Sequence, residues 1–315
     1  MLTLLLLVTP MLGACDKLPF RSGPQTAFDA NAAMSYTKEQ LAFGPRVPGT
    51  PAAARAGDWI TSMMRQRADS VIEQRWTHRT LDGKDLPLRN ILARFNPKAQ
   101  NRILYVTHWD TRPTADEDPV LGNRNTPIPG ANDGAAGVGL FVALGDALKK
   151  APPTVGVDLL FVDGEDYGKS FDPPYADVLL GSQYFAAHLP AVDYQPIFGV
   201  LWDMIGDKDL NILQEVNSVQ KAPEVVSRVW ETAKELGYDK YFIPQVGQAI
   251  IDDHIPLLEK GLRVIDVIDI DYGPLNSMGV PSPSYHHTLQ DTIDKISVHS
   301  LQVVGDVALK LIQQG

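Results

Sequence analysis

Carboxylate and imidazole side chains, the groups that most often bind metals and move protons, fall into six short groups along this chain. The groups are His108-Trp-Asp110, Asn132-Asp133, Glu165-Asp166, Asp203, Asp252-Asp253-His254 and His286-His287. Carboxylates gathered at one place repel one another unless a cation or a shared proton offsets their charge. Imidazole nitrogen combined with carboxylate oxygen is a donor set typical of zinc rather than calcium or magnesium. The residue types therefore predict a zinc site, provided that the fold brings the groups together.

The segments between these groups alternate between two patterns. Short apolar runs rich in β-branched residues predict buried strands, and apolar residues at helical spacing predict helices. The predicted strands are 102–107, 155–162, 197–202 and 263–268, and the predicted helices are 134–150, 182–188, 222–236 and 298–313, with a further helix from Pro51. This alternation predicts one α/β domain: a mixed, mostly parallel central sheet with helices on both faces.

The polar groups lie where the predicted strands end. Parallel strands finish at one edge of a sheet, and ligands bind outside that edge. Single members have plainer explanations, since Asp133 and Asp252 are good helix N-caps and Asp110 suits a turn. Six such coincidences at successive strand ends favour one shared site.

The first fifteen residues differ from the rest. Residues 2–12 are almost wholly apolar and end in Leu-Gly-Ala-Cys15, which resembles the lipobox of bacterial lipoproteins, although no Lys or Arg precedes the run. Cys15 is the single cysteine of the chain. We expect residues 1–15 to be a signal segment, Cys15 to carry a lipid anchor, residues 16–35 to form a tether and residues 36–315 to form the catalytic domain. The protein would then be exported and held at the membrane of the cell envelope through Cys15 alone.

The composition of the chain argues against nucleic-acid binding and against sites built from several cysteines. The 315 residues carry a formal net charge of −10, with 38 acidic and 28 basic side chains. A chain this acidic lacks the basic surface that nucleic-acid binding requires. One cysteine excludes an intrachain disulfide and a cysteine-rich zinc module. We expect a monomer with no nucleic-acid partner.

The motifs resemble those of the zinc aminopeptidases with the bacterial leucyl aminopeptidase fold, a fold that glutaminyl cyclases share. The sequence is most similar to bacterial glutaminyl cyclases in four motifs: 108–113 (HWDTRP), 130–135 (GANDGA), 163–168 (DGEDYG) and 252–256 (DDHIP). The resemblance implies that Asp133, Asp166 and His287 bind one zinc ion, with Glu165 as general acid/base. It also implies that Asp203 and Asp252 form a hydrogen-bonded acidic pair. His287 is chosen over His286 because it directly precedes Thr288, as in the family's His-Thr pair. Asp166 stands where animal cyclases have a longer Glu.

The resemblance implies a reaction. The N-terminal glutamine of a peptide or protein substrate would cyclise to pyroglutamate with release of ammonia, and zinc would act as a Lewis acid. Three aromatic side chains, Trp109, Trp202 and Tyr167, are expected to wall the pocket, although ordinary core packing explains them as well.

The main alternative is a two-zinc aminopeptidase, because all five of its ligands are present. His108 and Asp203 would hold a second zinc ion, and Asp133 would bridge the two ions. Asp252 in its Asp-Asp-His-Ile-Pro setting favours the cyclase, since an acidic partner there can draw Asp203 away from a metal. A third hypothesis, a non-catalytic binding module, predicts loss of at least one of Asp133, Glu165, Asp166 or His287, and none is lost.

Overall fold

The computed structural model describes residues 27–315, and its centre is a six-stranded sheet. In spatial order the strands are β1 (Ser70–Arg79), β2 (Asp85–Phe95), β4 (Gly156–Val162), β3 (Arg102–His108), β5 (Phe198–Asp203) and β8 (Val264–Ile268). The pairings β4–β3, β3–β5 and β5–β8 are parallel, whereas β1–β2 and β2–β4 are antiparallel. The predicted mixed, mostly parallel sheet is confirmed. It also places the ends of β3, β4, β5 and β8 at one edge.

The hairpin β1–β2 was absent from the sequence prediction. Polar residues interrupt the apolar run of β2, and two of them, Arg89 and Asn90, are nevertheless buried. Arg89 donates to the Asp58 carboxylate at 2.7 Å, and the Asn90 amide donates to the Gly181 carbonyl at 2.8 Å. Because tertiary partners satisfy these side chains, a strand forms where local pattern gives little sign of one.

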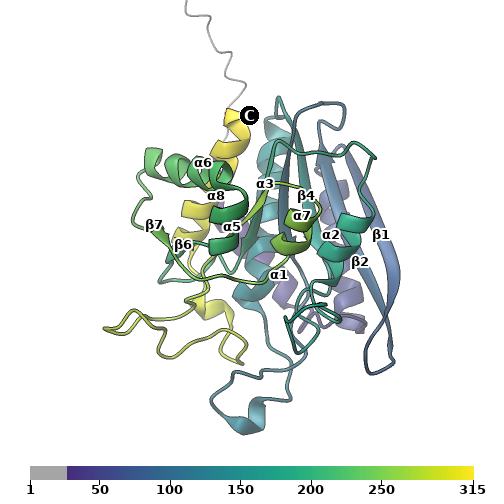
Figure 1. Ribbon diagram of the computed structural model, residues 1–315, viewed down its shortest axis with the longest axis vertical. Coiled ribbons are helices and arrows are strands. Elements are labelled where there is room, and N and C mark those ends of the chain that lie inside the picture. The colour runs from purple at the N-terminus through teal and green to yellow at the C-terminus, as the bar shows by residue number, and fades with distance from the viewer. Residues whose placement is uncertain (1–26) are drawn as a thin grey trace, which may run out of the picture.

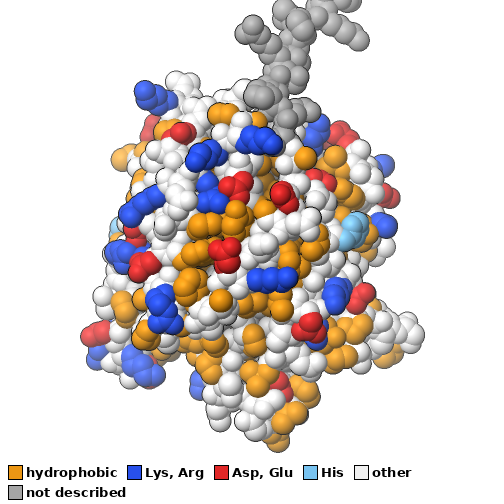
Figure 2. Space-filling model, turned by 180° about the vertical axis from the view of Figure 1, so that it is seen from behind, with side chains coloured by type: hydrophobic (Ala, Val, Ile, Leu, Met, Phe, Trp, Pro, Cys, Tyr) orange, Lys and Arg blue, Asp and Glu red, His pale blue; other side chains and the backbone are white. Residues whose placement is uncertain are grey.

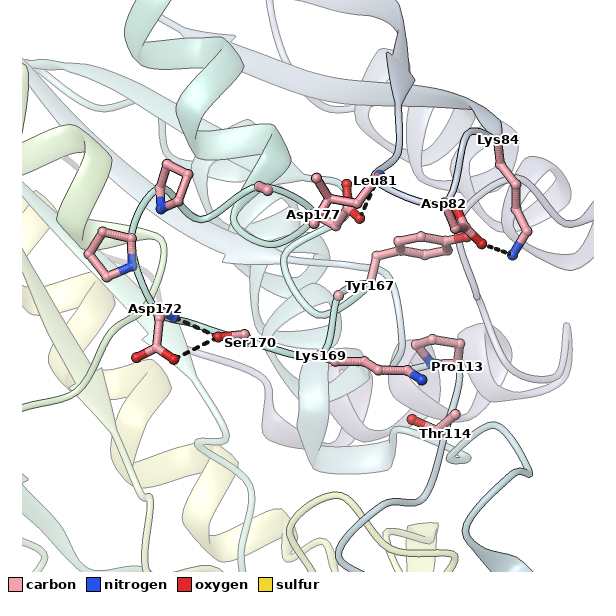
Figure 3. Close-up of a pocket in the computed structure, with 14 residues that line it drawn as sticks. Leu81, Asp82, Lys84, Pro113, Thr114, Tyr167, Lys169, Ser170, Asp172 and Asp177 are labelled. Carbon is pink, nitrogen blue, oxygen red and sulfur yellow. Dashed lines mark hydrogen bonds and ion pairs between the residues drawn. The ribbon is translucent and has the colours of Figure 1, made fainter.

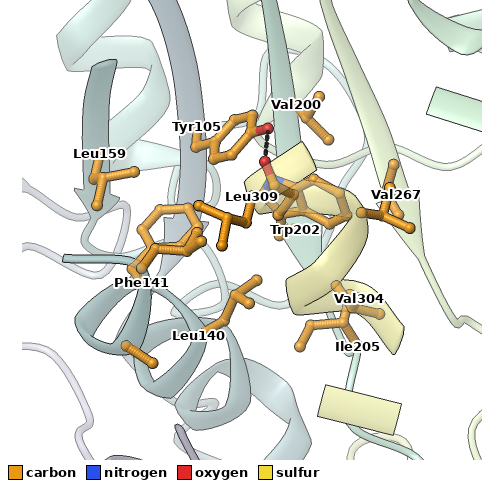
Figure 4. Packing of buried hydrophobic residues seen from close by; sticks show 14 of the residues in the cluster. Tyr105, Leu140, Phe141, Leu159, Val200, Trp202, Ile205, Val267, Val304 and Leu309 are labelled. Atoms are coloured by element: carbon orange, nitrogen blue, oxygen red, sulfur yellow. Dashed lines mark hydrogen bonds between the residues drawn. The ribbon is translucent and has the colours of Figure 1, made fainter. Parts of the chain in front are cut away.

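Helices cover both faces of the sheet (Figure 1). One large apolar cluster joins the sheet to α1 (Ala30–Leu41), α2 (Pro51–Arg65), α3 (Gly137–Lys150), α6 (Pro223–Glu235) and α8 (Val298–Gln314). A second cluster on the other face takes in α4 (Leu180–Ala187) and α7 (His254–Glu259). Successive residues of β3 alternate between the clusters, with Tyr105 in the first and Leu104 in the second. Figure 4 shows the first cluster, where the Tyr105 hydroxyl donates to the carbonyl of Ala308 at 2.8 Å.

Smaller elements complete the domain. The helix α5 (Val216–Lys221) and a two-stranded sheet of β6 (Ile212–Gln214) and β7 (Phe242–Val246) lie beyond the β8 side. The short 3₁₀ turns are 121–123 and 293–295. An irregular turn spans Ala131–Ala136 just before α3, and its backbone is non-helical at Asp133 and Gly134. The helix predicted from Pro51 is confirmed, and the Thr50 hydroxyl caps it by accepting the backbone N–H of Ala53 at 3.2 Å.

The predicted tether ends too late in the sequence, because the folded domain starts before residue 36. Helix α1 already begins at Ala30, capped by the Asp29 carboxylate, and Phe28 is buried against Gly305 of α8. The face that α1 buries consists of small and polar residues together with Met34, so its apolar period is weak and the sequence pattern missed it. The expected signal segment, including Cys15, lies outside the described residues.

This boundary can be tested by truncation. We expect a chain that begins at residue 36 to unfold at much lower urea concentration than one that begins at residue 27, because it lacks the first half of α1 and the Phe28 contact. Removing one buried aromatic side chain alone costs about 3–5 kcal/mol of unfolding free energy. Urea unfolding of the two chains, followed by circular dichroism, gives the comparison. Equal midpoints would restore residue 36 as the start of the folded domain.

Two long segments, 109–130 and 269–292, extend from the edge where β3 and β8 end (Figure 1). On the face opposite to that view, acidic and basic side chains are intermingled among hydrophobic ones (Figure 2). Within residues 27–315, no helix has the length and apolar character needed to cross a bilayer.

Candidate metal and active site

A cavity of about 380 Å³ lies at the edge where the parallel strands end, and most of the predicted catalytic and metal-binding residues line it. Its acidic and imidazole lining consists of Asp116, Glu117, Asp133, Glu165, Asp203, Asp252, His286 and His287. Its apolar lining includes Met204, Ile250, Ile268 and Ile270. Because these residues follow strands that end at the same edge of the sheet, they lie close together although they are far apart in sequence.

Three of the predicted ligands converge on one point. The His287 Nε2 atom lies 3.4 Å from Asp166 Oδ2 and 3.7 Å from Asp133 Oδ2. All three side chains are buried, and their donor atoms lie within 4.8 Å of one another. Burial alone would lower the pKa of His287, but the facing Asp166 and Asp133 charges raise it to about 10. The group has the size and chemistry of a zinc ligand set.

A second group shares one member with the first. The His108 Nε2 atom lies 3.1 Å from Asp133 Oδ1 and 3.1 Å from Asp203 Oδ1. Asp133 thus presents one carboxylate oxygen to each group, as a bridging ligand would. Burial would lower the pKa of His108, yet the charge of Asp203 and contacts with Asp110 and Asp133 raise it well above its ordinary value. The geometry therefore offers either a second metal position or a cationic His108 held between two carboxylates.

Unpaired buried atoms mark the same place. Buried polar atoms are nearly always hydrogen-bonded in proteins, so a cluster of exceptions needs an explanation. Within residues 27–315, the buried atoms that make no hydrogen bond include both ring nitrogens of His108, Asp133 Oδ2, Asp166 Oδ2 and Asp203 Oδ1. A bound cation would satisfy the oxygens and the facing imidazole nitrogens together. The residues present therefore fit a zinc ion.

A second layer of side chains, missed by the sequence reasoning, fixes the loop that carries Asp133. The buried Asp291 carboxylate accepts the backbone N–H groups of Asn132 at 2.8 Å and Asp133 at 3.3 Å, and it also accepts the Tyr272 hydroxyl at 2.7 Å. The Asn132 side chain ties the same loop to the end of β5 through the Met204 carbonyl and the Gly206 N–H. Gly134 is required here, because a Cβ atom would lie 2.6 Å from His108 Nε2.

This layer gives a prediction about metal affinity. We expect Asp291→Asn to weaken zinc binding about 10–100-fold, the usual effect of losing a partner that orients a ligand. The amide keeps only one acceptor oxygen for two loop N–H groups. Competitive titration with a chromophoric chelator measures the affinity directly. Asp294→Asn is the matched control, because that carboxylate is exposed and pairs with Lys295. Unchanged affinity in Asp291→Asn would contradict the positioning role.

Two further residues hold the remaining ligand loops. The buried Asp110 carboxylate accepts the N–H groups of Glu165 at 3.2 Å and Asp166 at 3.3 Å. The Arg112 guanidinium donates to Asp166 Oδ1 at 2.5 Å, leaving Asp166 Oδ2 to face His287. The sequence motif contained both residues, but only the structure shows what each one contacts. Asp166 is therefore arranged to bind a metal through one oxygen.

The predicted pairing of Asp203 with Asp252 stays a prediction. Asp203 Oδ1 faces His108 Nε2 at 3.1 Å, while Asp252 Oδ1 accepts the N–H of Asp253 at 2.5 Å. Strand β5 ends at Asp203 and directs its carboxylate toward His108 at the end of the neighbouring strand. Burial and then the Asp203 charge raise the pKa of Asp252 well above its ordinary value. Asp252 is therefore a buried carboxyl group in the pocket, close enough to Asp203 for the two charges to interact.

Glu165 lies in the same cavity and belongs to neither ligand group. Its side chain is buried, and its Oε2 atom lies 3.9 Å from His108 Nδ1. Burial and the adjacent Asp166 charge raise the pKa of Glu165 well above its ordinary value. A carboxyl group shifted in this direction can both accept and return a proton near neutral pH.

None of the three aromatic residues predicted to wall the pocket lines the active-site cavity. Trp109 and Trp202 are fully enclosed in the first apolar cluster, and Trp202 packs edge-on against Tyr105 at a centroid distance of 5.5 Å. Neighbouring strand residues point to opposite faces, so Trp202 points into the core although Asp203 reaches the site. Tyr167 lines a different cavity beside the site. Isoleucines, Met204 and Phe171 form the apolar wall instead.

His286 and Glu117 lie at the mouth of the cavity. The His286 Nδ1 atom contacts Glu117 Oε2 at 3.1 Å, and the rings of His286 and His287 stack with centroids 3.6 Å apart. The second ring nitrogen of His287, Nδ1, lies 3.6 Å from Glu117 Oε1. His287 thus directs Nε2 to the carboxylates and Nδ1 to Glu117, which supports its assignment as the ligand over His286.

Comparisons with known proteins agree with this geometry. The profile of peptidase family M28 matches residues 90–312. The structure is similar to Bacteroides thetaiotaomicron glutaminyl cyclase bound to N-acetylhistamine, with a TM-score of 0.85 and 36% identity over 93% of this chain and 99% of that chain. It is similar to a Zn-dependent exopeptidase from Parabacteroides distasonis, with a TM-score of 0.85 and 34% identity over 93% and 100% of the two chains. Aminopeptidase YwaD of Bacillus subtilis is 24% identical over 307 residues, and the match covers 91% of this chain but only 58% of that protein.

Proposed function

Because the chain belongs to peptidase family M28 and its pocket holds two buried carboxyl groups beside a ligand set, we propose that it is a glutaminyl cyclase. The substrate would be a peptide or protein with N-terminal glutamine. The α-amine nitrogen attacks the side-chain amide carbon, a five-membered lactam forms, the bond to the amide nitrogen breaks and ammonia leaves. No water takes part, so the reaction needs a pocket that excludes water rather than one that positions it.

The observation that carries this proposal is Asp252. It is a buried carboxyl group, and one of its oxygens has no hydrogen-bond partner in the described part of the chain. It lines the pocket with Glu165 and stands outside both ligand groups. Hydrolysis and cyclisation both have to protonate a leaving nitrogen, and Glu165 can do so in either reaction. Asp252 adds a second carboxyl group that can hydrogen-bond the side-chain amide nitrogen of a glutamine substrate.

The roles follow from position. Asp133, Asp166 and His287 would hold the zinc ion, which when bound supplies Lewis-acid polarisation of the substrate's side-chain carbonyl. Glu165 accepts the proton of the attacking amine and delivers it to the departing nitrogen. Asp252, whose pKa is raised by burial and by the Asp203 charge, hydrogen-bonds that nitrogen and orients it. The side chains of Met204, Ile250, Ile268 and Ile270 enclose the glutamine methylene groups and exclude water.

The test uses three peptides that differ only in the first residue. We expect zinc-loaded protein to convert Gln-Ala-Ala to a lactam of lower mass and release ammonia. Asn-Ala-Ala should stay intact, since the same attack would close a strained four-membered ring, and Leu-Ala-Ala should stay intact because it has no side-chain amide. Release of free leucine would contradict the cyclase proposal.

A second candidate, a two-zinc aminopeptidase, is favoured by the arrangement of His108, Asp133 and Asp203. Since one carboxylate oxygen of Asp203 faces His108, the structure retains a second candidate metal position. The two candidates differ in metal content. A cyclase with one zinc per chain should keep that zinc in His108→Ala, whereas a two-zinc enzyme should fall from two zinc ions to one. Elemental analysis of dialysed protein measures both.

We also propose that the protein is exported and anchored through Cys15. The apolar run before Leu-Gly-Ala-Cys15 supports this. Intact-mass analysis of the membrane fraction of a bacterial host should show a chain that begins at a lipid-modified Cys15, and Cys15→Ser should abolish the modification.

A further inference from the structure

A second cavity, of about 680 Å³, adjoins the candidate active site, and no predicted role accounts for it. We propose that this adjoining groove holds the residues that follow the N-terminal glutamine, and that Lys169 binds a carboxylate on one of them. The proposal rests on the proposed function only in taking a peptide with a free N-terminus as the ligand.

The groove and the active site share one wall. Lys169 lines both cavities. The ligand-holding residues Arg112 and Asp166 face the active site, and the residues next to them in sequence, Pro113 and Tyr167, line the groove. Figure 3 shows Lys169 extending toward Pro113, with the Tyr167 ring reaching across the groove. A chain that enters the active site by its N-terminus therefore passes Lys169 on its way into the groove.

The size and lining of the groove suit a peptide. The active-site cavity, at about 380 Å³, accommodates the reacting glutamine, and the groove provides nearly twice that volume beyond it. Its apolar walls come from three separate segments: Leu81 on the β1–β2 turn, Pro113 after β3, and Tyr167 with Pro173 and Pro174 in the loop before α4. Leu81 is 83% exposed, so a bound chain has apolar surface to cover.

Two charged side chains of the groove, Asp172 and Lys169, have no oppositely charged partner among residues 27–315. Asp82 pairs with Lys84 at 2.7 Å, Asp177 contacts His78 Nε2 at 2.8 Å, and the Asp172 side chain accepts only the Ser170 hydroxyl at 2.9 Å. Lys169 is exposed and makes no ion pair or hydrogen bond with any residue between 27 and 315. The unpaired charge at the junction of the two cavities is therefore positive, and it complements a carboxylate on the bound chain.

That carboxylate has two sources, and peptide pairs distinguish them. An acidic side chain at the second position is tested by Gln-Glu-Ala-amide against its neutral isostere Gln-Gln-Ala-amide. The C-terminal carboxylate of a short peptide is tested by Gln-Ala as the free acid against Gln-Ala-amide. We measure KM and kcat for each on the zinc-loaded full chain, scoring both lactam and freed N-terminal residue. Calorimetric binding of the same peptides to Glu165→Gln gives Kd without turnover.

We expect the peptide with the carboxylate to have a KM and a Kd about two- to fivefold lower than its neutral partner, the range of an exposed ion pair, with similar kcat. The ratio should fall to about one in Lys169→Ala and reverse in Lys169→Glu. Lys98→Ala, an exposed lysine near the opposite end of β3, should keep the wild-type ratio. Thr114→Trp, which fills the groove, should raise KM for Gln-Ala-Ala-Ala more than for glutamine amide.

Three results would overturn the inference: equal KM and Kd within both peptide pairs, a preference that persists in Lys169→Ala, or a preference for lysine at the second position, which would place the chain along Asp116 and Glu117 instead. Failure of the proposed function appears differently, as absence of lactam from every glutaminyl peptide while the Kd comparison still reports on the groove.

Discussion

Glu165→Gln should lower kcat for lactam formation about 10²–10⁴-fold, the usual contribution of a general acid/base. The amide is nearly isosteric with the carboxylate but cannot take the proton of the attacking amine. Because Glu165 belongs to neither ligand group, the variant should bind zinc as tightly as the wild type. Ammonia release measured on protein of known zinc content separates these two effects.

The control for this variant is Glu39→Gln, which makes the same chemical change on the exposed side of α1. It should leave kcat and zinc content unchanged. If Glu165→Gln retained wild-type kcat, another group would have to move the proton, and Asp252 is a buried carboxyl group of the cavity that belongs to neither ligand group. If Glu165→Gln lost its zinc, Glu165 would be a ligand rather than an acid/base.

His287→Ala should remove the metal site itself. Loss of a mere orienting partner costs 10–100-fold in zinc affinity, so loss of a ligand should cost more than about 100-fold. Activity should disappear with the zinc, since two facing carboxylates remain without their imidazole. Chelator competition and the lactam assay on the same samples show whether both losses occur together.

His286→Ala is the matched comparison, because the two histidines are neighbours and their rings stack. Its Nδ1 atom contacts Glu117 at the cavity mouth rather than the buried carboxylates, so the variant should keep its zinc. A result in which His286→Ala loses zinc and His287→Ala retains it would exchange the two assignments.

The sequence predicted the convergence of Asp133, Glu165, Asp203 and His287 because one rule suffices: parallel strands end at one edge, and their following loops meet there. Local patterns also located the main strands and helices of the parallel part, to within a few residues. The sequence patterns did not predict the antiparallel hairpin or α1, because their buried faces carry polar or small residues whose partners are distant in sequence.

The supporting layer of the site could not be predicted for the same reason. Asp291 accepts N–H groups from a loop about 160 residues earlier, and Arg112 holds Asp166 across a gap of 54 residues. The prediction for Trp109 and Trp202 was wrong for a different reason. They are next to site residues in sequence, but proximity in sequence does not determine the direction of a side chain. On a strand, the residue before a ligand points to the other face.

The most direct test of the cyclase proposal is the partition of a single substrate between two reactions. A peptide that begins with glutamine can lose ammonia to form a lactam, or it can be hydrolysed to release free glutamine, and mass spectrometry of one time course distinguishes the products. We predict lactam as the product and no free glutamine above the level seen without enzyme. Free glutamine as the main product would contradict the cyclase and identify His108, Asp133 and Asp203 as the second metal site of an aminopeptidase.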